Sequence, residues 1–291
     1  MSLNAWDAAL IAVKTITYAA TLGAAGAAFF LGYCGALIAS GDGLRIRRAV
    51  VGFATLAVFA GALQIMVSAG SLSGDAAGML DGSLIHMVWD TGANRSNSLR
   101  AAGLLVVALG VLSNRAAWPA YVGAVMAATS FAWTGHARSL NPDVLPMLLL
   151  GVHLLGVAFW MGALLPLLTV LRGGDRPRTA ATVARFGRVG LFVVGGLMAA
   201  GLCVLSMLLG GVAELWSSAY GRCITLKLGL VVCILCMAAF NKLRLTPRLL
   251  AGDAAAERIL RASIRVELSL GGLILAVTAT LTTVVGPPTL G

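Results

Sequence analysis

The residue with the clearest chemical potential in this sequence is His153, which lies inside the long apolar stretch Val144–Leu171. At about 1.5 Å per residue this stretch can cross a bilayer as one helix, with the imidazole about ten residues inside it. A polar ring at that depth needs a partner, so a functional role is the first hypothesis. Gly156 and Trp160 share its helical face, and the glycine leaves room for a neighbouring helix or a ligand. The alternative is a neutral histidine bonded to a hydroxyl or carbonyl of another helix.

The composition places this helix in a polytopic membrane protein. Hydrophobic residues make up 59% of the 291 residues and charged residues 11%, whereas a soluble domain carries about 25% charged residues. Apolar segments of membrane-spanning length recur at 8–39, 47–71, 98–114, 117–135, 144–171, 183–211, 219–242 and 263–285. We therefore predict an all-α fold, with one transmembrane domain over 1–291 and about eight membrane helices.

The placement of lysine and arginine predicts the orientation. Basic residues concentrate in or beside alternate connections, namely those after the first, third, fifth and seventh segments. They are Arg45, Arg47, Arg48, Arg115, Arg172, Arg176, Arg178, Arg185, Arg188, Lys242, Arg244, Arg248, Arg258, Arg261 and Arg265. Because cytoplasmic loops carry the positive excess, these connections are predicted to be cytoplasmic and both termini periplasmic. The net charge of +10 then reflects orientation, and nucleic acid is not expected as a partner.

The connection 75–100 is long and polar, and it is predicted to be periplasmic. Apolar residues recur through its centre at helical spacing. They are Met79, Leu80, Leu84, Met87 and Val88. This pattern predicts an amphipathic segment that lies along the membrane surface.

The predicted orientation brings all three histidines to the periplasmic side. His86 lies in the connection 75–100, His136 follows the fourth segment, and His153 lies in the outer half of the fifth, six residues after Met147. Imidazole and thioether together suit copper, and thioether favours Cu(I). The oxygen-rich ligand sets of Ca²⁺ and Mg²⁺ are missing. We predict a periplasmic copper site formed by His86, His136, His153 and Met147, although methionine is also an ordinary apolar filler.

Two charged residues lie deep in the last two segments. Lys227 is about eight residues into the seventh segment, and Glu267 is about ten residues from the inner end of the eighth. Each would be costly alone, at about 2.5–3.5 kcal/mol on insertion scales. A mutual ion pair is therefore predicted. Such a pair could fix one helix against the other, or it could line a polar route.

Several motifs in the second half of the chain resemble the copper-resistance protein D family. They are TGHA at 134–137, HLLGVAFWMGALLPL at 153–167, YGRCITLKLGL at 220–230, NKLRLTPRL at 241–249, and RVELSLGG at 265–272 followed by Pro287 and Pro288. They occur in the family's order, so 116–288 is interpreted as a family-like core. The segment 1–115 resembles the family only in its helix pattern. The family's usual Trp-Gly-Gly reads Trp160-Met161-Gly162 here, which places a thioether where a glycine is usual.

The resemblance implies a protein of the bacterial inner membrane that moves copper across it, together with a periplasmic copper-binding partner of the CopC type. The matching positions are His136, His153, Trp160, Lys227 and Glu267. The chain has no G-x-x-x-x-G-K-[ST] motif, so transport is expected to be passive or coupled to an ion gradient and not driven by ATP. A transport protein, and not an enzyme, is the expectation.

Two other functions stay open. His136 or His86 could join His153 as axial ligands of haem b in a membrane electron-transfer protein. Against this, His153 is the only histidine inside a predicted helix. The chain could also bind copper for docking or sensing without moving it.

Overall fold

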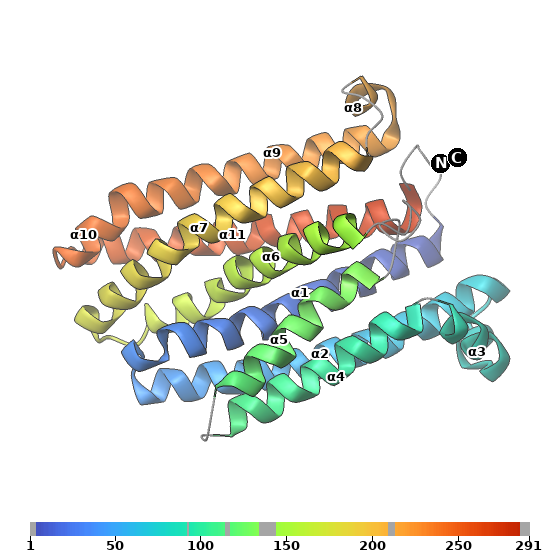
Figure 1. Cartoon of the computed structure of the whole chain (residues 1–291), viewed down its shortest axis with the longest axis horizontal. Helices are drawn as coiled ribbons and strands as arrows, with labels where there is room; N and C mark the ends of the chain where they lie inside the picture. The colour runs from blue at the N-terminus through green and yellow to red at the C-terminus, as the bar shows by residue number, and fades with distance from the viewer. Residues whose placement is uncertain (1–3, 92, 114–116, 134–143, 209–212, 286–291) are drawn as a thin grey trace.

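The structure, a computed structural model, describes residues 4–91, 93–113, 117–133, 144–208 and 213–285. The described chain forms long helices that run side by side along one axis (Figure 1). In order, the elements are α1 (Ala5–Cys34), η1 (Gly35–Leu37), α2 (Ser40–Ser73), η2 (Ala77–Leu80), α3 (Gly82–Asp90), α4 (Ala93–Leu112), α5 (Trp118–Thr129), η3 (Ser130–Trp133), α6 (Val144–Val170), α7 (Arg176–Leu208), α8 (Glu214–Ser217), α9 (Ala219–Phe240), η5 (Asn241–Leu245), α10 (Thr246–Leu250), α11 (Ala254–Thr280) and η6 (Leu281–Val285). The predicted all-α polytopic fold is confirmed.

Seven helices in the described part of the chain are long and apolar enough to cross a membrane. They correspond to seven of the eight predicted segments. The remaining segment, 117–135, contains the shorter helix α5 followed by the 3₁₀ turn η3. It packs against α4, α1 and α6, so it belongs to the bundle even though its described part is short for a span.

The two ends of the bundle carry different elements. One end holds the start of α1, the helices α3 and α8, and the end of α11, whereas α10 lies at the other (Figure 1). We call these the outer and inner ends, after the predicted orientation. Whether the outer end faces the periplasm stays a prediction.

Helix α1 is the centre of the packing. It contacts α2, α4, α5, α6, α7 and α11, and its inward residues are mostly small, with Ala20, Ala24 and Ala25 almost fully buried. At the crossing with α6, Gly26 lies against Gly162 and the Ala158 carbonyl, so closely that a Cβ at Gly26 would collide with α6 backbone. Small residues let helix backbones approach in membranes, and here they set the position of α6.

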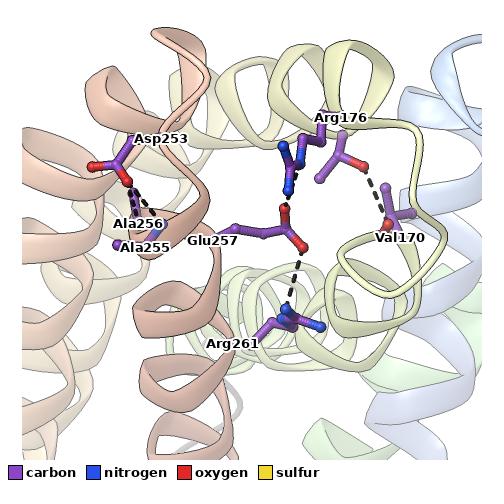
Figure 2. A network of polar contacts seen from close by, with 8 residues as sticks. Val170, Arg176, Asp253, Ala255, Ala256, Glu257 and Arg261 are labelled. Atoms are coloured by element: carbon purple, nitrogen blue, oxygen red, sulfur yellow. Dashed lines mark hydrogen bonds and ion pairs between the residues drawn. The ribbon is translucent and has the colours of Figure 1, made fainter.

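The inner ends of α7 and α11 are joined by a polar network (Figure 2). Glu257 lies 3.5 Å from Nε of Arg176 on α7 and 3.3 Å from Arg261 on its own helix. Asp253 accepts hydrogen bonds from the backbone N–H groups of Ala255 and Ala256, and so caps α11. An N-cap carboxylate satisfies backbone donors that the helix itself leaves free. This network fixes where α11 enters the bundle.

The connection 75–100 is shorter than predicted, because α4 begins at Ala93. Its amphipathic part is the short helix α3, capped by Asp81. Leu80 just before α3, and Met87 and Trp89 within it, are exposed, as expected for a segment that contacts lipid, although its position on the membrane surface stays a prediction. Arg100 does not belong to the connection. It lies inside α4 and is 5% exposed.

Candidate functional site

The ring of His153 lies between α6 and α7 and is held by one hydrogen bond. Its Nδ1 lies 3.2 Å from the Leu197 carbonyl oxygen of α7. A carbonyl can only accept, so in the neutral ring Nδ1 carries the hydrogen and Nε2 carries the free lone pair. Metal-binding histidines are oriented in this way, with one nitrogen bonded to a carbonyl and the other on the metal. The bonded histidine expected from the sequence and a metal-binding histidine are thus compatible here.

Two glycines make the contact around His153 possible. A Cβ at Gly156 would lie 2.9 Å from Cβ of Leu197, and a Cβ at Gly201 would lie 2.9 Å from Nδ1 of His153. Both positions therefore need glycine for α7 to approach the ring this closely. The space predicted at Gly156 is thus filled by α7. Trp160 shares this face of α6 and is 9% exposed.

Lys227 is a charged residue of α9 in the outer half of the bundle. It is partly buried. His153 lies nine residues after the start of α6 and Lys227 eight residues after the start of α9, so both are about 12–13 Å from the outer ends of their helices. One imidazole and one ammonium from two helices thus lie at a similar depth in the outer half.

The predicted ion pair between Lys227 and Glu267 is not formed. Glu267 instead accepts a hydrogen bond of 2.5 Å from Nδ2 of Asn241. Asn241 lies fourteen residues beyond Lys227 along one continuous helical stretch, which is about 21 Å. The prediction failed because apolar flanks show that a charge is buried but do not show at which depth its partner lies. Asn241 is the residue that the sequence reasoning missed, although it stands in the motif NKLRLTPRL.

Met161 lies between these two sites. Its methyl group occupies the space beside Gly271 of α11, where a Cβ would collide with it. Gly271 is one helical turn from Glu267, on the same side of α11. The thioether therefore lies at the contact of α6 with α11, about 12 Å along α6 from His153.

Two of the other predicted copper ligands, His86 and Met147, do not lie beside His153. His86 is exposed on α3, and its Nδ1 lies 3.0 Å from Asp90. Met147 lies about 9 Å from His153 along α6 and is rotated by about 120° around it, so the two side chains leave the helix on different sides. His136 falls outside the described residues. Within the residues that the structure describes, no group of three or more His, Cys, Asp or Glu side chains could hold a metal ion.

Arg100 is a second polar residue that the sequence reasoning misplaced. Its guanidinium donates to the hydroxyls of Ser130 and Ser96 and to the Asn97 amide oxygen, at 2.8–3.1 Å. It also stacks on Phe131, 4.0 Å from the ring centre. Arg100 thereby ties α4 to η3 through neutral partners. The sequence did contain the clue, because Arg100 falls two residues inside the apolar segment 98–114.

Comparison with known proteins defines the class to which this arrangement belongs. The family model described as copper resistance protein D matches residues 180–281. The model described as the copper resistance protein D-like N-terminal domain matches residues 4–143. The chain belongs to the copper-resistance protein D family. With its apolar helices, it is a multi-pass protein of the bacterial inner membrane.

Two relatives have names that bear on function. The chain is 26% identical over 161 residues to the copper transport protein CutJ of Bacillus subtilis, over 54% of this chain and 28% of that protein. It is 28% identical over 135 residues to the inner membrane protein YebZ of Escherichia coli, over 45% of this chain and 46% of that protein. The chain thus spans less than half the length of either relative. No solved structure matches it.

Proposed function

We propose that this protein moves copper across the inner membrane and that the ion passes Nε2 of His153. The observation that carries this proposal is the ring itself, half-buried in the outer half with Nδ1 bonded to the Leu197 carbonyl. Membership of a copper-resistance family supports copper as the cargo. The protein then acts as a transporter and not as an enzyme.

The separated ligands favour transfer in steps over a single multi-histidine site. We propose that His86 and His136 meet copper at the periplasmic face and that Met147 leads it into the bundle. His153 takes it next, and Trp160 and Met161 border the route further in. Weak sites in series suit a transporter, because an ion must be able to leave each site as well as enter it. A periplasmic copper-binding protein of the CopC type is the proposed donor or acceptor at the outer face.

This proposal requires the outer end to face the periplasm. Reporter fusions after Ser40 and Gly173 should behave as cytoplasmic, because they follow the predicted inner ends of their helices. Fusions after Asn141 and Ser217 should behave as periplasmic. Inverted results at two of these sites would contradict the orientation.

The test is copper flux into proteoliposomes with the purified full chain and with His153→Gln. Glutamine keeps a side-chain N–H for the Leu197 carbonyl but lacks the imidazole lone pair, so a structural role would survive the change. We expect folded protein with copper flux reduced about tenfold or more, which corresponds to about 1.4 kcal/mol or more. Flux equal to that of the parent would show that the histidine is structural. Stoichiometric haem in the purified parent would instead favour electron transfer.

A further inference from the structure

A buried acid–amide contact joins α9 to α11 in the inner half of the bundle. Glu267 is 2% exposed and Asn241 is 9% exposed. Nδ2 of Asn241 donates to Oε1 of Glu267 at 2.5 Å. The outer-half features around His153 lie far from this contact, so its role needs a separate account.

The amide oxygen of Asn241 indicates whether the carboxyl group of Glu267 is protonated. Oδ1 of Asn241 is buried and has no hydrogen-bond partner. An ionised carboxylate can only accept, so it would leave this oxygen unsatisfied in a buried setting, which is unfavourable. A protonated carboxyl group has one O–H donor. It can form the paired arrangement in which amide N–H donates to one acid oxygen and acid O–H donates to the amide oxygen.

The charged groups around this contact do not stabilise a carboxylate. Among the described residues, none forms an ion pair with Glu267. On η5, Lys242 donates to the Gly187 carbonyl of α7, and Arg244 is exposed. On α10, Arg248 pairs with Asp253.

The other charged residues on and around α11 also form no ion pair with Glu267. On α11 itself, Arg261 pairs with Glu257 and Arg265 is exposed. Along α6 and the inner half of α1, the described residues carry no Lys, Arg, Asp or Glu. On α7, Arg185 stacks on Tyr33 of α1. A buried carboxyl group without a cation is most stable in its neutral form.

The backbone at this contact departs from an ordinary α-helix. Asn241 begins the π-helical segment η5, and the Thr246 hydroxyl donates to its carbonyl at 2.9 Å. Single π turns inside α-helices occur frequently at functional sites. Asn241 therefore stands where α9 departs from regular α-helical hydrogen bonding.

We propose that Glu267 and Asn241 form an intramembrane proton-binding site that couples transport to proton movement. In this site Glu267 carries the proton. When it is released, the O–H bond breaks, the proton leaves to water, and one negative charge stays in the inner half. A singly charged copper ion in transit restores neutrality there, so one proton is exchanged for one positive charge. The coupling rests on the proposed function, whereas the bound proton does not.

The bound proton can be tested without copper. Infrared difference spectra of the full chain in lipid nanodiscs should show a protonated carboxylic-acid C=O band at neutral pH that disappears in Glu267→Gln. Asn241→Leu should shift this band. The matched control is Glu257→Gln, because Glu257 is paired with two arginines and should contribute only carboxylate bands. A carboxylate band lost in Glu267→Gln would overturn the proposal.

The coupling can be tested in proteoliposomes that contain a pH-sensitive dye. Parent protein should move protons against copper, whereas Glu267→Gln should keep its fold and lose the proton movement. Its copper flux should fall about tenfold or more. Parent copper flux without proton movement, or unchanged proton movement in the variant, would overturn the coupling. An absence of copper flux in the parent would overturn the proposed function and the coupling, while the infrared result would still decide the proton site.

Discussion

The N-terminal and C-terminal helices of this bundle are built differently. In the most apolar part of α1, 61% of the residues are buried inside the protein, whereas in α7 and α9 the share is 11%. The buried side of α1 consists mainly of alanine and glycine. Of the described side chains proposed for transport, His86 comes from α3, and the others come from α6, α11 and the segment η5 that follows α9.

The difference separates a scaffold from the helices that do chemistry. Where α1 crosses α6 the backbones are in contact, and a Cβ at Gly26 or Gly162 would collide with the facing helix. Around α9, the acid–amide contact of Asn241 with Glu267 is made by side chains and not by backbones in contact. A transporter needs both properties, because part of it must hold its shape while another part moves.

The largest effect is expected where the scaffold is tightest. Gly26→Leu should prevent or severely weaken folding, by about 3 kcal/mol or more, because overpacking here strikes α6 backbone. Gly229→Ala on α9 should be almost neutral, since no atom lies within 4 Å of its added Cβ. Thermal unfolding in detergent measures both. Similar losses in the two variants would contradict the division into scaffold and working helices.

A smaller loss is expected at Arg100. Arg100→Met should cost about 1–3 kcal/mol, because it removes three hydrogen bonds and the stacking on Phe131. Arg100→Lys should recover only part of this, since an ammonium cannot reproduce the planar arrangement. Thermal stability, with copper flux as the second readout, tests the assignment. If Arg100→Met is stable but has no copper flux, Arg100 would belong to the copper route and not to the structural scaffold.

In the C-terminal helices, the stability losses of two substitutions should add where the two residues are apart and should be non-additive where they are in contact. Lys227→Met and Glu267→Gln should add to within about 0.5 kcal/mol, because the residues do not meet. Asn241→Leu and Glu267→Leu should be strongly non-additive, since each single change leaves a buried polar group without its partner. Chemical or thermal unfolding of each set gives the coupling energies. Non-additive stability losses for Lys227 and Glu267 would instead support the ion pair predicted from the sequence.

The smallest effect is expected at the inner surface, and it depends on pH. The hydrogen bond from Arg248, with those from Ala255 and Ala256, lowers the pKa of Asp253 below its ordinary value. The carboxylate therefore adds stability above the unfolded pKa of about 4, and this is lost as the pH falls through the folded value. The difference in melting temperature between the parent and Asp253→Ala should shrink on acidification. A difference that is constant with pH would contradict this.

The sequence predicted the fold well because hydropathy and charge act along the chain. The membrane segments follow from apolar length, and the small residue at Gly156 correctly indicated a close neighbour of His153. Contacts between distant helices were harder. The partner of Glu267 depends on how α9 and α11 slide relative to each other, which no local pattern reports, and so Asn241 was missed.

The predicted copper ligands show the same limit, because the sequence does not tell which side chains from different helices come together. Orientation could place three histidines on one side, but it could not say whether they converge. The structure leaves His86 with Asp90 and turns Met147 away from His153, because helix periodicity separates residues six apart. His136 lies outside the described residues, and its part in the route stays a prediction.

The central claim is that copper in transit binds Nε2 of His153. X-ray absorption of the copper-loaded parent and of His153→Gln tests it directly, because scattering from an imidazole ring differs from that of thioether or oxygen ligands. With His86→Gln present in both proteins, so that its exposed ring does not contribute, the account predicts imidazole scattering in the parent background that decreases on the His153 substitution. Identical imidazole scattering in the two proteins would contradict it.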